Sequence, residues 1–212
     1  MVSGRDEGRL AEAIADIGGG TPVVTDLTSI EAAEALVAAA TEAMGGVDIL
    51  VTNNGGPPPG DFASTDMSAY QTALDLNLLS MVGLCKAAVP TMQAHGWGRV
   101  VAITSISVRQ PIATLILSNT ARAGFTGFLK TLALEVAGDG VTVNSVQPGL
   151  HATKRLTDLH ADLDGLGSTL PTGRVGDPGD FGQVAAFLCS EQAKFVTGAA
   201  VPVDGGQYGG LQ

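Results

Sequence analysis

Apolar residues follow two alternating patterns along the chain. Short apolar runs bounded by turn residues are typical of buried parallel strands, and apolar residues repeated every three or four positions indicate amphipathic helices. The runs predict strands at residues 22–25, 48–51, 99–103, 141–146 and 199–203, and residues 1–5 resemble the end of another strand. The periodic stretches predict helices at residues 7–17, 29–44, 68–90, 118–136 and 181–190. This alternation predicts an α/β fold with a doubly wound parallel sheet.

One stretch late in the chain follows neither pattern. Residues 150–180 are rich in Gly, Asp and Leu without clear periodicity, which is typical of an irregular lid over a substrate. The chain has 212 residues, a length that fits one domain with a sizeable core. We therefore expect a single domain over residues 1–212 with the lid inside it.

Composition narrows the classes of partner. The net charge of −10 argues against binding nucleic acid or an anionic membrane through a basic surface. The longest apolar runs are too short for a membrane span, and the chain does not open with the pattern of a secretory leader. Cys85 and Cys189 lie far apart in apolar helical contexts, which favours buried free thiols in a reducing cytoplasm. We expect a cytoplasmic protein with a small-molecule partner and no metal site.

Polar side chains that could take part in catalysis are concentrated in the middle of the chain. Ser105 follows the strand at residues 99–103, and Ser118 and Arg122 share one face of the next helix, one turn apart. Ligands of open α/β sheets bind beyond the carboxyl ends of the strands, where these groups would meet. His151 is the one histidine expected near them, either as a lid or surface residue or as a substitute acid.

Further motifs stand near the ends of the other predicted strands, except Asn77, which falls in the middle of the predicted helix at residues 68–90. They are Asp26-Leu27, Asn53-Asn54-Gly55-Gly56, Asn77, Asn144 with Pro148-Gly149, and Val203-Asp204-Gly205-Gly206. In this order the motifs resemble those of the short-chain dehydrogenase/reductase family, and in particular its 3-oxoacyl-(acyl carrier protein) reductase-like members. The resemblance runs from Ser3 to Gly206, which is nearly the whole chain.

The resemblance implies a Rossmann-like fold, an NADP or NAD cofactor and NADP(H)-linked reduction of a carbonyl substrate. The implied catalytic residues are Asn77, which would hold a proton-relaying water, Ser105, which would bond the substrate carbonyl, and Ser118 and Arg122 at the positions of the family's acid and its partner. The implied cofactor-binding residues are Arg5, Asp26, Leu27, Asn53, Asn54, Gly55, Arg122, Pro148, Gly149, His151 and Thr153. Arg5 either favours NADP by binding a 2′-phosphate or is a solvated surface residue.

The chain departs from the family pattern at the catalytic helix. The family has a tyrosine four residues before a lysine, whereas this chain has Ser118 and Arg122. Its two tyrosines, Tyr70 and Tyr208, are not followed by a lysine at this spacing. A serine hydroxyl is a far weaker acid than a phenol, and loss of a general acid removes about 10²–10⁴-fold of rate. The sequence therefore predicts weak or lost activity.

A second departure concerns the start of the fold. Members of the family begin with a strand and a glycine-rich turn that cradles the cofactor pyrophosphate, and no such turn precedes Arg5. We expect an N-terminally truncated fold without the first strand and the first helix. The strand at residues 48–51 would then have an uncovered edge, and the simplest repair places residues 22–25 beside it.

Three functions remain open at this stage. The chain is an oxidoreductase, a non-catalytic relative that binds a ligand or serves in assembly, or the truncated product of a normal-length reductase gene. The predicted helices at residues 68–90 and 118–136 have a wider apolar face than is needed to pack one side of a helix on the sheet. Soluble monomers rarely expose such a surface, so we also expect a homodimer or homotetramer.

Overall fold

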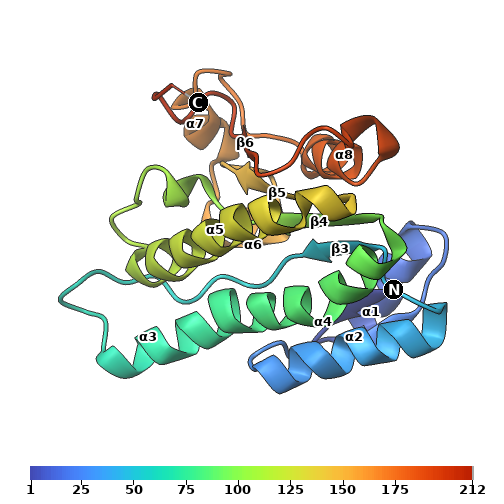
Figure 1. Cartoon of the computed structure of the whole chain (residues 1–212). Helices are drawn as coiled ribbons and strands as arrows, with labels where there is room; N and C mark the ends of the chain where they lie inside the picture. Colours follow the sequence, from blue (N-terminus) through green and yellow to red (C-terminus); the bar gives the residue numbers. More distant parts are fainter. Residues whose placement is uncertain (212) are drawn as a thin grey trace.

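The computed structural model describes residues 1–211, apart from the side chain of residue 159, and shows a layered α/β fold (Figure 1). Every strand pair in it is parallel. The strands are β1 Val2–Gly4, β2 Pro22–Val24, β3 Ile49–Thr52, β4 Gly98–Ile103, β5 Val141–Pro148 and β6 Ala200–Val203. The predicted parallel sheet and the strand at the start of the chain are both confirmed.

The strands form two sheets. β1 pairs with β2, and the second sheet has the order β3-β4-β5-β6. Within the described residues, β3 pairs with β4 alone, so its other edge has no strand partner. The expected repair, with residues 22–25 beside residues 48–51, is wrong. Residues 22–24 pair instead with β1, because Val2 N–H and Thr25 N–H bond to the carbonyls of Thr21 and Gly4.

Helices cover both faces of the larger sheet. Their bounds are α1 Glu7–Asp16, α2 Ile30–Met44, α3 Met67–Leu74, α4 Ser80–His95, α5 Ile116–Val136, α6 Lys154–Leu159, α7 Leu163–Ser168 and α8 Pro178–Leu188. Alternate strand residues face opposite layers. Val100 and Val143 pack in the core formed with α2, α4 and α5, whereas Val101 and Val146 pack with Leu188 of α8. The core is thus built on β4 and β5.

Local signals explain where α2 begins and ends. Ser29 Oγ accepts a hydrogen bond from Ala32 N–H at 3.2 Å, which satisfies a free donor of the first turn. Gly45 ends the helix with a φ of 82°, a left-handed conformation that costs glycine little. α2 packs closely on α4, and a Cβ added at Gly83 would lie 3.2 Å from the Ala33 Cβ. The predicted helix at residues 29–44 is confirmed.

The predicted helix at residues 68–90 is longer than expected and contains a break in its regularity. α3 passes through a π turn at Asp75–Leu79 into α4, which continues past Pro90 to His95. The stretch Met67–His95 has 29 residues, and its most apolar 18-residue window has a mean hydropathy of 1.4, so by length and composition it could cross a membrane. This corrects the expectation that the apolar runs are too short. Half of its most apolar window is buried within the fold, as in a core helix.

The lid is more regular than its sequence indicates. Within residues 150–180, the structure has α6 and α7, each begun by a side-chain cap. Thr153 Oγ1 accepts from Leu156 N–H, and Asp162 Oδ1 accepts from Gly165 N–H. Helices of six residues are too short to show a periodic apolar pattern, which is why this region was predicted to be irregular.

Candidate functional site

A pocket of about 720 Å³ opens at the carboxyl ends of the strands. Its walls come from residues 3–5 at the end of β1, residues 53–57 after β3, residues 103–106 at the end of β4 and residues 148–151 at the end of β5. The lid adds Arg155 and Leu156 of α6, and Phe181 of α8. This is the position where parallel α/β folds bind ligands.

Most of the predicted site residues line this pocket. They are Arg5, Leu27, Asn53, Asn54, Gly55, Ser105, Ser118, Arg122, Pro148, Gly149, His151 and Thr153. Asp26 and Asn77 do not line it. Asp26 is exposed beside the pocket, and Asn77 is buried behind Gly55. The topology therefore gathers residues that are far apart in the sequence.

Asn77 lies in the π turn between α3 and α4. Its Nδ2 donates to the Gly55 carbonyl at 2.9 Å, and its buried Oδ1 has no hydrogen-bond partner within the described part of the chain. Turns of this type are frequent at functional sites, and a buried oxygen without a donor is a natural site for an ordered water. The side chain thus supports the floor of the pocket and leaves one acceptor for a water.

Asn54 ties three segments together below the pocket. Its Nδ2 donates to the Leu27 carbonyl at 3.1 Å and to the Leu76 carbonyl at 2.9 Å, and its Oδ1 accepts from Gly55 N–H at 2.8 Å. These bonds occupy both ends of the amide group. Asn53, its neighbour, is exposed and faces the pocket.

Two serines occupy the centre of the pocket wall. Ser105 Oγ accepts from Ser107 N–H at 3.1 Å, so its own proton remains free to donate to a ligand. Ser118 on α5 is 7% exposed and lines the pocket. Among the described pocket residues there is no tyrosine. Tyr70 belongs to α3, and Tyr208 bonds through its backbone N–H to Asp204.

Arg122 joins the ends of two strands. Its Nη1 donates to the Ile103 and Thr104 carbonyls at 3.0 and 3.3 Å, and its Nη2 donates to the Asn54 carbonyl at 3.1 Å. Burial, together with the charge of Arg155, lowers the pKa of Arg122 to about 10, so the guanidinium keeps its charge at neutral pH. The side chain contributes fixed positive charge and strand positioning.

His151 is buried, with 9% of its surface exposed, so it is not a surface histidine, although it lies within the lid segment at residues 150–180. Its ring packs edge-on against Phe181, with 5.0 Å between the ring centroids, and its Nδ1 lies 3.3 Å from the Gly149 carbonyl. The ring is buried because a short parallel bridge between His151 and Gly176 holds the lid over it. The imidazole still lines the pocket.

Arg155 is a pocket residue that sequence reasoning missed. It is the second residue of α6, and its guanidinium lies over Gly56: a Cβ added there would be 2.8 Å from Nη1. At the preceding residue, Arg5 Nη2 is 4.0 Å from the Cβ position of Gly55. The signal available in the sequence was its position two residues after Thr153.

Comparison with known proteins places the chain among reductases and dehydrogenases. The sequence profile of a family described as Enoyl-(Acyl carrier protein) reductase matches residues 1–207. A solved structure titled short chain dehydrogenase/reductase family protein is 33% identical with a TM-score of 0.88, over 98% of this chain and 86% of its own. This chain belongs to the short-chain dehydrogenase/reductase family. The family resemblance and the Rossmann-like fold are thereby confirmed.

Curated members of the short-chain dehydrogenase/reductase family differ in their named substrates. The L-rhamnose 1-dehydrogenase (NAD(P)(+)) of Azotobacter vinelandii is 36% identical over 99% of this chain and 86% of its own length. The 3-oxoacyl-[acyl-carrier-protein] reductase of Vibrio cholerae is 35% identical over 89% of this chain and 78% of its own length. The acetoacetyl-CoA reductase of Cupriavidus necator is 36% identical over 79% of this chain and 68% of its own length. This short-chain dehydrogenase/reductase therefore has sugar-directed and acyl-directed relatives.

Two solved structures of the family contain NADPH. The L-sorbose reductase of Gluconobacter frateurii, complexed with NADPH and L-sorbose, is 30% identical with a TM-score of 0.91 over 99% of this chain and 86% of its own. An NADPH-bound oxidoreductase from Pseudomonas aeruginosa, described as containing an atypical catalytic center, is 26% identical with a TM-score of 0.89 over the same shares. Solved relatives align with 98–99% of this chain, so the comparisons give no support to the expected N-terminally truncated fold.

Proposed function

We propose that this protein binds NADP(H) in the pocket and reduces a small carbonyl compound of the 3-oxoacyl class, slowly, in the cytoplasm. Membership of the family supports the reaction type, and the acyl-directed relatives support the substrate class. The observation that carries the slow turnover is the identity of Ser118, a serine at the position where the family has its acid.

The pocket residues fit a nicotinamide dinucleotide. The pocket combines apolar walls, such as Leu27 and Ile106, with the guanidinium groups of Arg5 and Arg155. Guanidinium groups bind phosphates through charge-assisted hydrogen bonds. Arg5, which lies beside Gly55, would bind a 2′-phosphate, and this favours NADP over NAD. Gly55 leaves room for a ligand to approach the backbone closely, because the nearest atom to its Cβ position is Arg5 Nη2 at 4.0 Å, whereas the Arg155 guanidinium lies over Gly56. Leu27, Asn53, Gly149 and Thr153 would complete the binding surface.

The bound cofactor would supply the hydride for carbonyl reduction. This chain's own residues would bind and polarise the substrate. Ser105 would donate its hydroxyl proton in a hydrogen bond to the substrate oxygen, and Ser118 stands on the adjacent wall. Arg122 would stabilise developing negative charge through its fixed charge, and Asn77 would hold a water below Gly55. None of these groups has the acidity of a phenol near neutral pH, so the proton that converts the alkoxide into the alcohol would come from water, for which Asn77 leaves a free acceptor.

A second candidate is a ligand-binding relative without turnover. Arg122 favours it, because three backbone carbonyls already accept from its guanidinium and it transfers no proton at neutral pH. In this case the pocket would bind the dinucleotide or an acyl ligand without chemistry. The reductase remains our proposal because Ser105 retains a free donor in the pocket.

Fluorescence titration with NADPH and NADH, followed by single-turnover assays on a 3-oxoacyl thioester, tests the proposal. We expect saturable binding that is tighter for NADPH, and substrate-dependent oxidation far below the enzyme median of about 10 s⁻¹. Binding without oxidation at long times would favour the ligand-binding candidate. Absence of any dinucleotide binding would overturn the proposed function.

A further inference from the structure

The pocket has a charge opposite to that of the whole protein. The chain carries a net charge of −10, yet the charged groups among the described lining residues are Arg5, Arg122 and Arg155, with no Asp or Glu among them. A concave surface lined by one sign of charge attracts ligands of the other sign. Such a concentration in an acidic protein indicates an anionic ligand.

Two of these arginines flank one short piece of backbone. Arg155 lies over Gly56, with Nη1 at 2.8 Å and Nη2 at 3.3 Å from the Cβ position of that glycine. Arg5 lies beside the adjacent Gly55, with Nη2 4.0 Å from its Cβ position. Any side chain at Gly56 would displace the guanidinium of Arg155. The dipeptide and the two cations thus form one compact surface.

Arg155 has no anionic partner within the described part of the protein. It makes no salt bridge and no hydrogen bond there, whereas its neighbour Lys154 pairs with Asp158 at 3.2 Å. The pKa of the half-buried Arg122 is lowered first by burial and second by the like charge of Arg155, so each of the two cations disfavours the other. Two cations held together without a carboxylate are stabilised when an anion binds between them.

We propose that Arg155 binds the pyrophosphate group of the ligand across Gly55–Gly56 and so determines which ligands the pocket accepts. The planar guanidinium can donate two parallel hydrogen bonds to phosphate oxygens, which an ammonium group cannot do in the same fixed geometry. The lid helix α6 therefore brings a binding group to the ligand as well as covering it. This inference rests on the proposed function for the use of the pocket. Two ligands contain such a group, a nicotinamide dinucleotide and a coenzyme A thioester.

Calorimetric titration with inorganic pyrophosphate tests the site without turnover. Wild-type protein, R155Q and K154Q are compared at low ionic strength. The last variant removes the same charge from the adjacent residue, which is exposed and outside the pocket lining. We expect saturable binding to the wild type and to K154Q, and binding at least about tenfold weaker to R155Q, as charge-assisted hydrogen bonds are lost. Equal affinity of the wild type and R155Q, or no saturable binding to the wild type, overturns the proposal.

Titrations with NADPH and with coenzyme A identify the source of the pyrophosphate. A loss of affinity in R155Q confined to NADPH assigns the site to the dinucleotide, and a loss confined to coenzyme A assigns it to the acyl carrier. Loss with neither ligand overturns the proposal. Because Arg155 is exposed, circular dichroism and melting curves should match the wild type. Failure of carbonyl reduction with intact pyrophosphate binding would contradict the proposed function alone.

Discussion

At the scale of single residues, Ser118 and Arg122 show what a sequence can and cannot reveal. The sequence alone predicts that these two residues lie on one face of the helix that follows a strand, because periodicity fixes which positions share a helix face. The bonds from Arg122 to the ends of β3 and β4 were not, because they depend on where two strands end in space. Arg155 was missed for a related reason, since residues 150–180 show no periodicity that places a side chain.

Restoring the family's residue pair should not restore an efficient enzyme. In the double variant S118Y/R122K, a phenol and an ammonium return to α5, but lysine cannot reproduce the planar set of bonds to three carbonyls. We expect turnover of a simple ketone to stay far below about 10 s⁻¹ and the melting temperature to fall. Steady-state assays and melting curves of both single variants and the double variant check this. A turnover near that median would show that the pair alone limits the reaction.

The two cysteines should differ in reactivity. Burial raises the pKa of the Cys85 thiol to about 12, and it also raises that of the half-buried Cys189, where Arg99 opposes the shift. At pH 8 an aromatic disulfide reagent should therefore modify Cys189 first and Cys85 only when the protein unfolds. Peptide mapping of the labelled protein gives the order, with denatured protein as the control.

The same raised pKa predicts a direction for stability against pH. The folded Cys85 keeps its proton when the unfolded thiol, near its ordinary value of about 8.5, loses it. The contribution of the Cys85 thiol to the free energy of unfolding is fully present below the pKa of the unfolded thiol, and it is lost as the pH rises toward 12. Urea midpoints measured from pH 8 to 10 should fall less in Cys85→Ala than in the wild type. An equal fall in both would contradict this origin.

At the scale of elements, the residues that position the pocket lie at breaks in regular structure. Strands and helices were predictable because their apolar periods are simple. The π turn at Asp75–Leu79 was not, because a stretch of five residues is too short for its own period to be recognised in the apolar pattern. The caps that begin α6 and α7 are Thr and Asp, which are equally common in loops, so the sequence favoured an irregular lid.

Asn54 and Asn53 provide a matched test of this positioning. Replacing Asn54 by alanine removes three hydrogen bonds and leaves the Leu27 carbonyl and the Gly55 N–H without these partners, while the Leu76 carbonyl keeps its bond from the Ser80 hydroxyl. We expect a loss of about 2–3 kcal/mol in the free energy of unfolding. Asn53 is exposed and has no such bonds, and Asn53→Ala should stay within about 0.5 kcal/mol. Urea unfolding of the three proteins decides the matter. Similar losses in both variants would mean that the amide of Asn54 does not link the segments.

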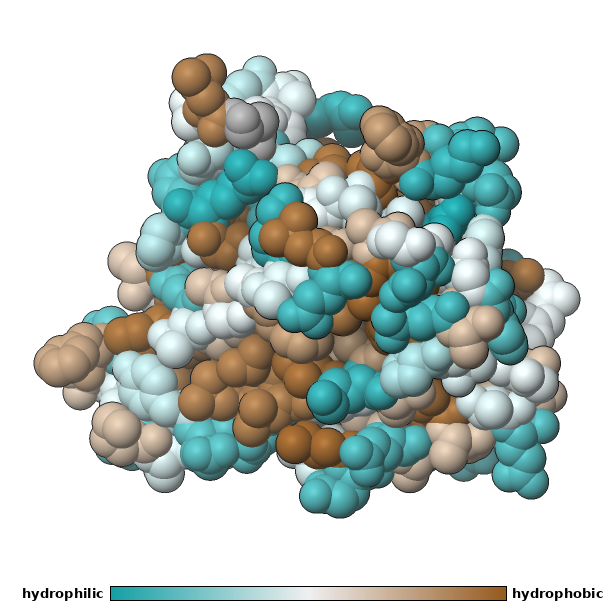
Figure 2. Space-filling view, viewed as in Figure 1, coloured by the Kyte–Doolittle hydropathy of each residue, from teal (hydrophilic) through white to brown (hydrophobic). Residues whose placement is uncertain are grey.

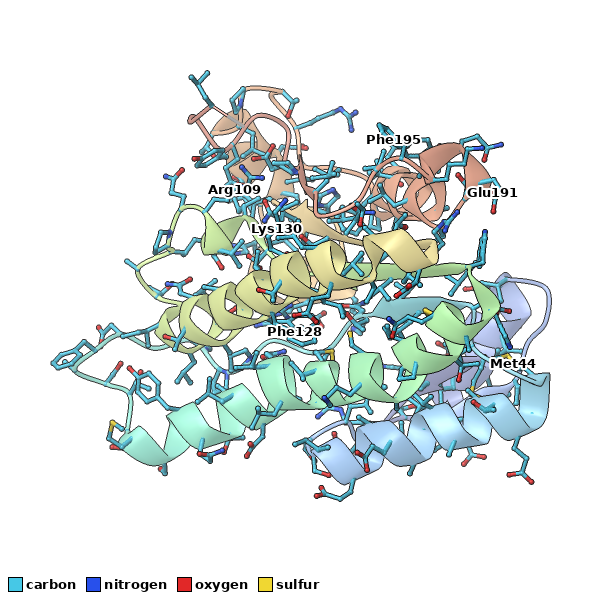
Figure 3. All side chains as sticks on the ribbon, viewed as in Figure 1. Met44, Arg109, Phe128, Lys130, Glu191 and Phe195 are labelled. Carbon is cyan, nitrogen blue, oxygen red and sulfur yellow. The ribbon has the colours of Figure 1, made fainter. Side chains whose placement is uncertain are left out.

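At the scale of the whole molecule, much of the apolar surface predicted for an interface is used internally. Phe125, Leu129 and Val136 of α5 and Met81 of α4 are buried in the chain's own core. Leu79 is 36% exposed and Leu134 is 73% exposed. Phe128 lies half-buried in α5 on its α4 side, in a region where apolar residues gather on the surface (Figures 2 and 3). The remaining patch is smaller than the sequence indicated.

We still expect a homodimer or homotetramer with a two-fold contact through α4 and α5. Leu134→Asp should shift the mass measured by light scattering at micromolar concentration toward the monomer, because a buried carboxylate has no partner at such a contact. Phe195→Asp is the control, since this fully exposed residue lies near α8, away from α4 (Figure 3). A monomeric wild type would refute the expectation.

The separation of β1 and β2 from the larger sheet has a consequence for the order in which backbone amides exchange their hydrogens. The segment from Val2 to Val24 packs its strands and α1 mainly on one another, and Ile49 and Val51 of β3 stay about half exposed. β4 and β5, by contrast, are paired on both edges and buried on both faces. Local opening of the first segment therefore costs less free energy than global unfolding. Deuterium should enter β1 and β2 well before β4 and β5, and a dinucleotide bound against Arg5 and Gly55 should slow its entry into β1 and β2.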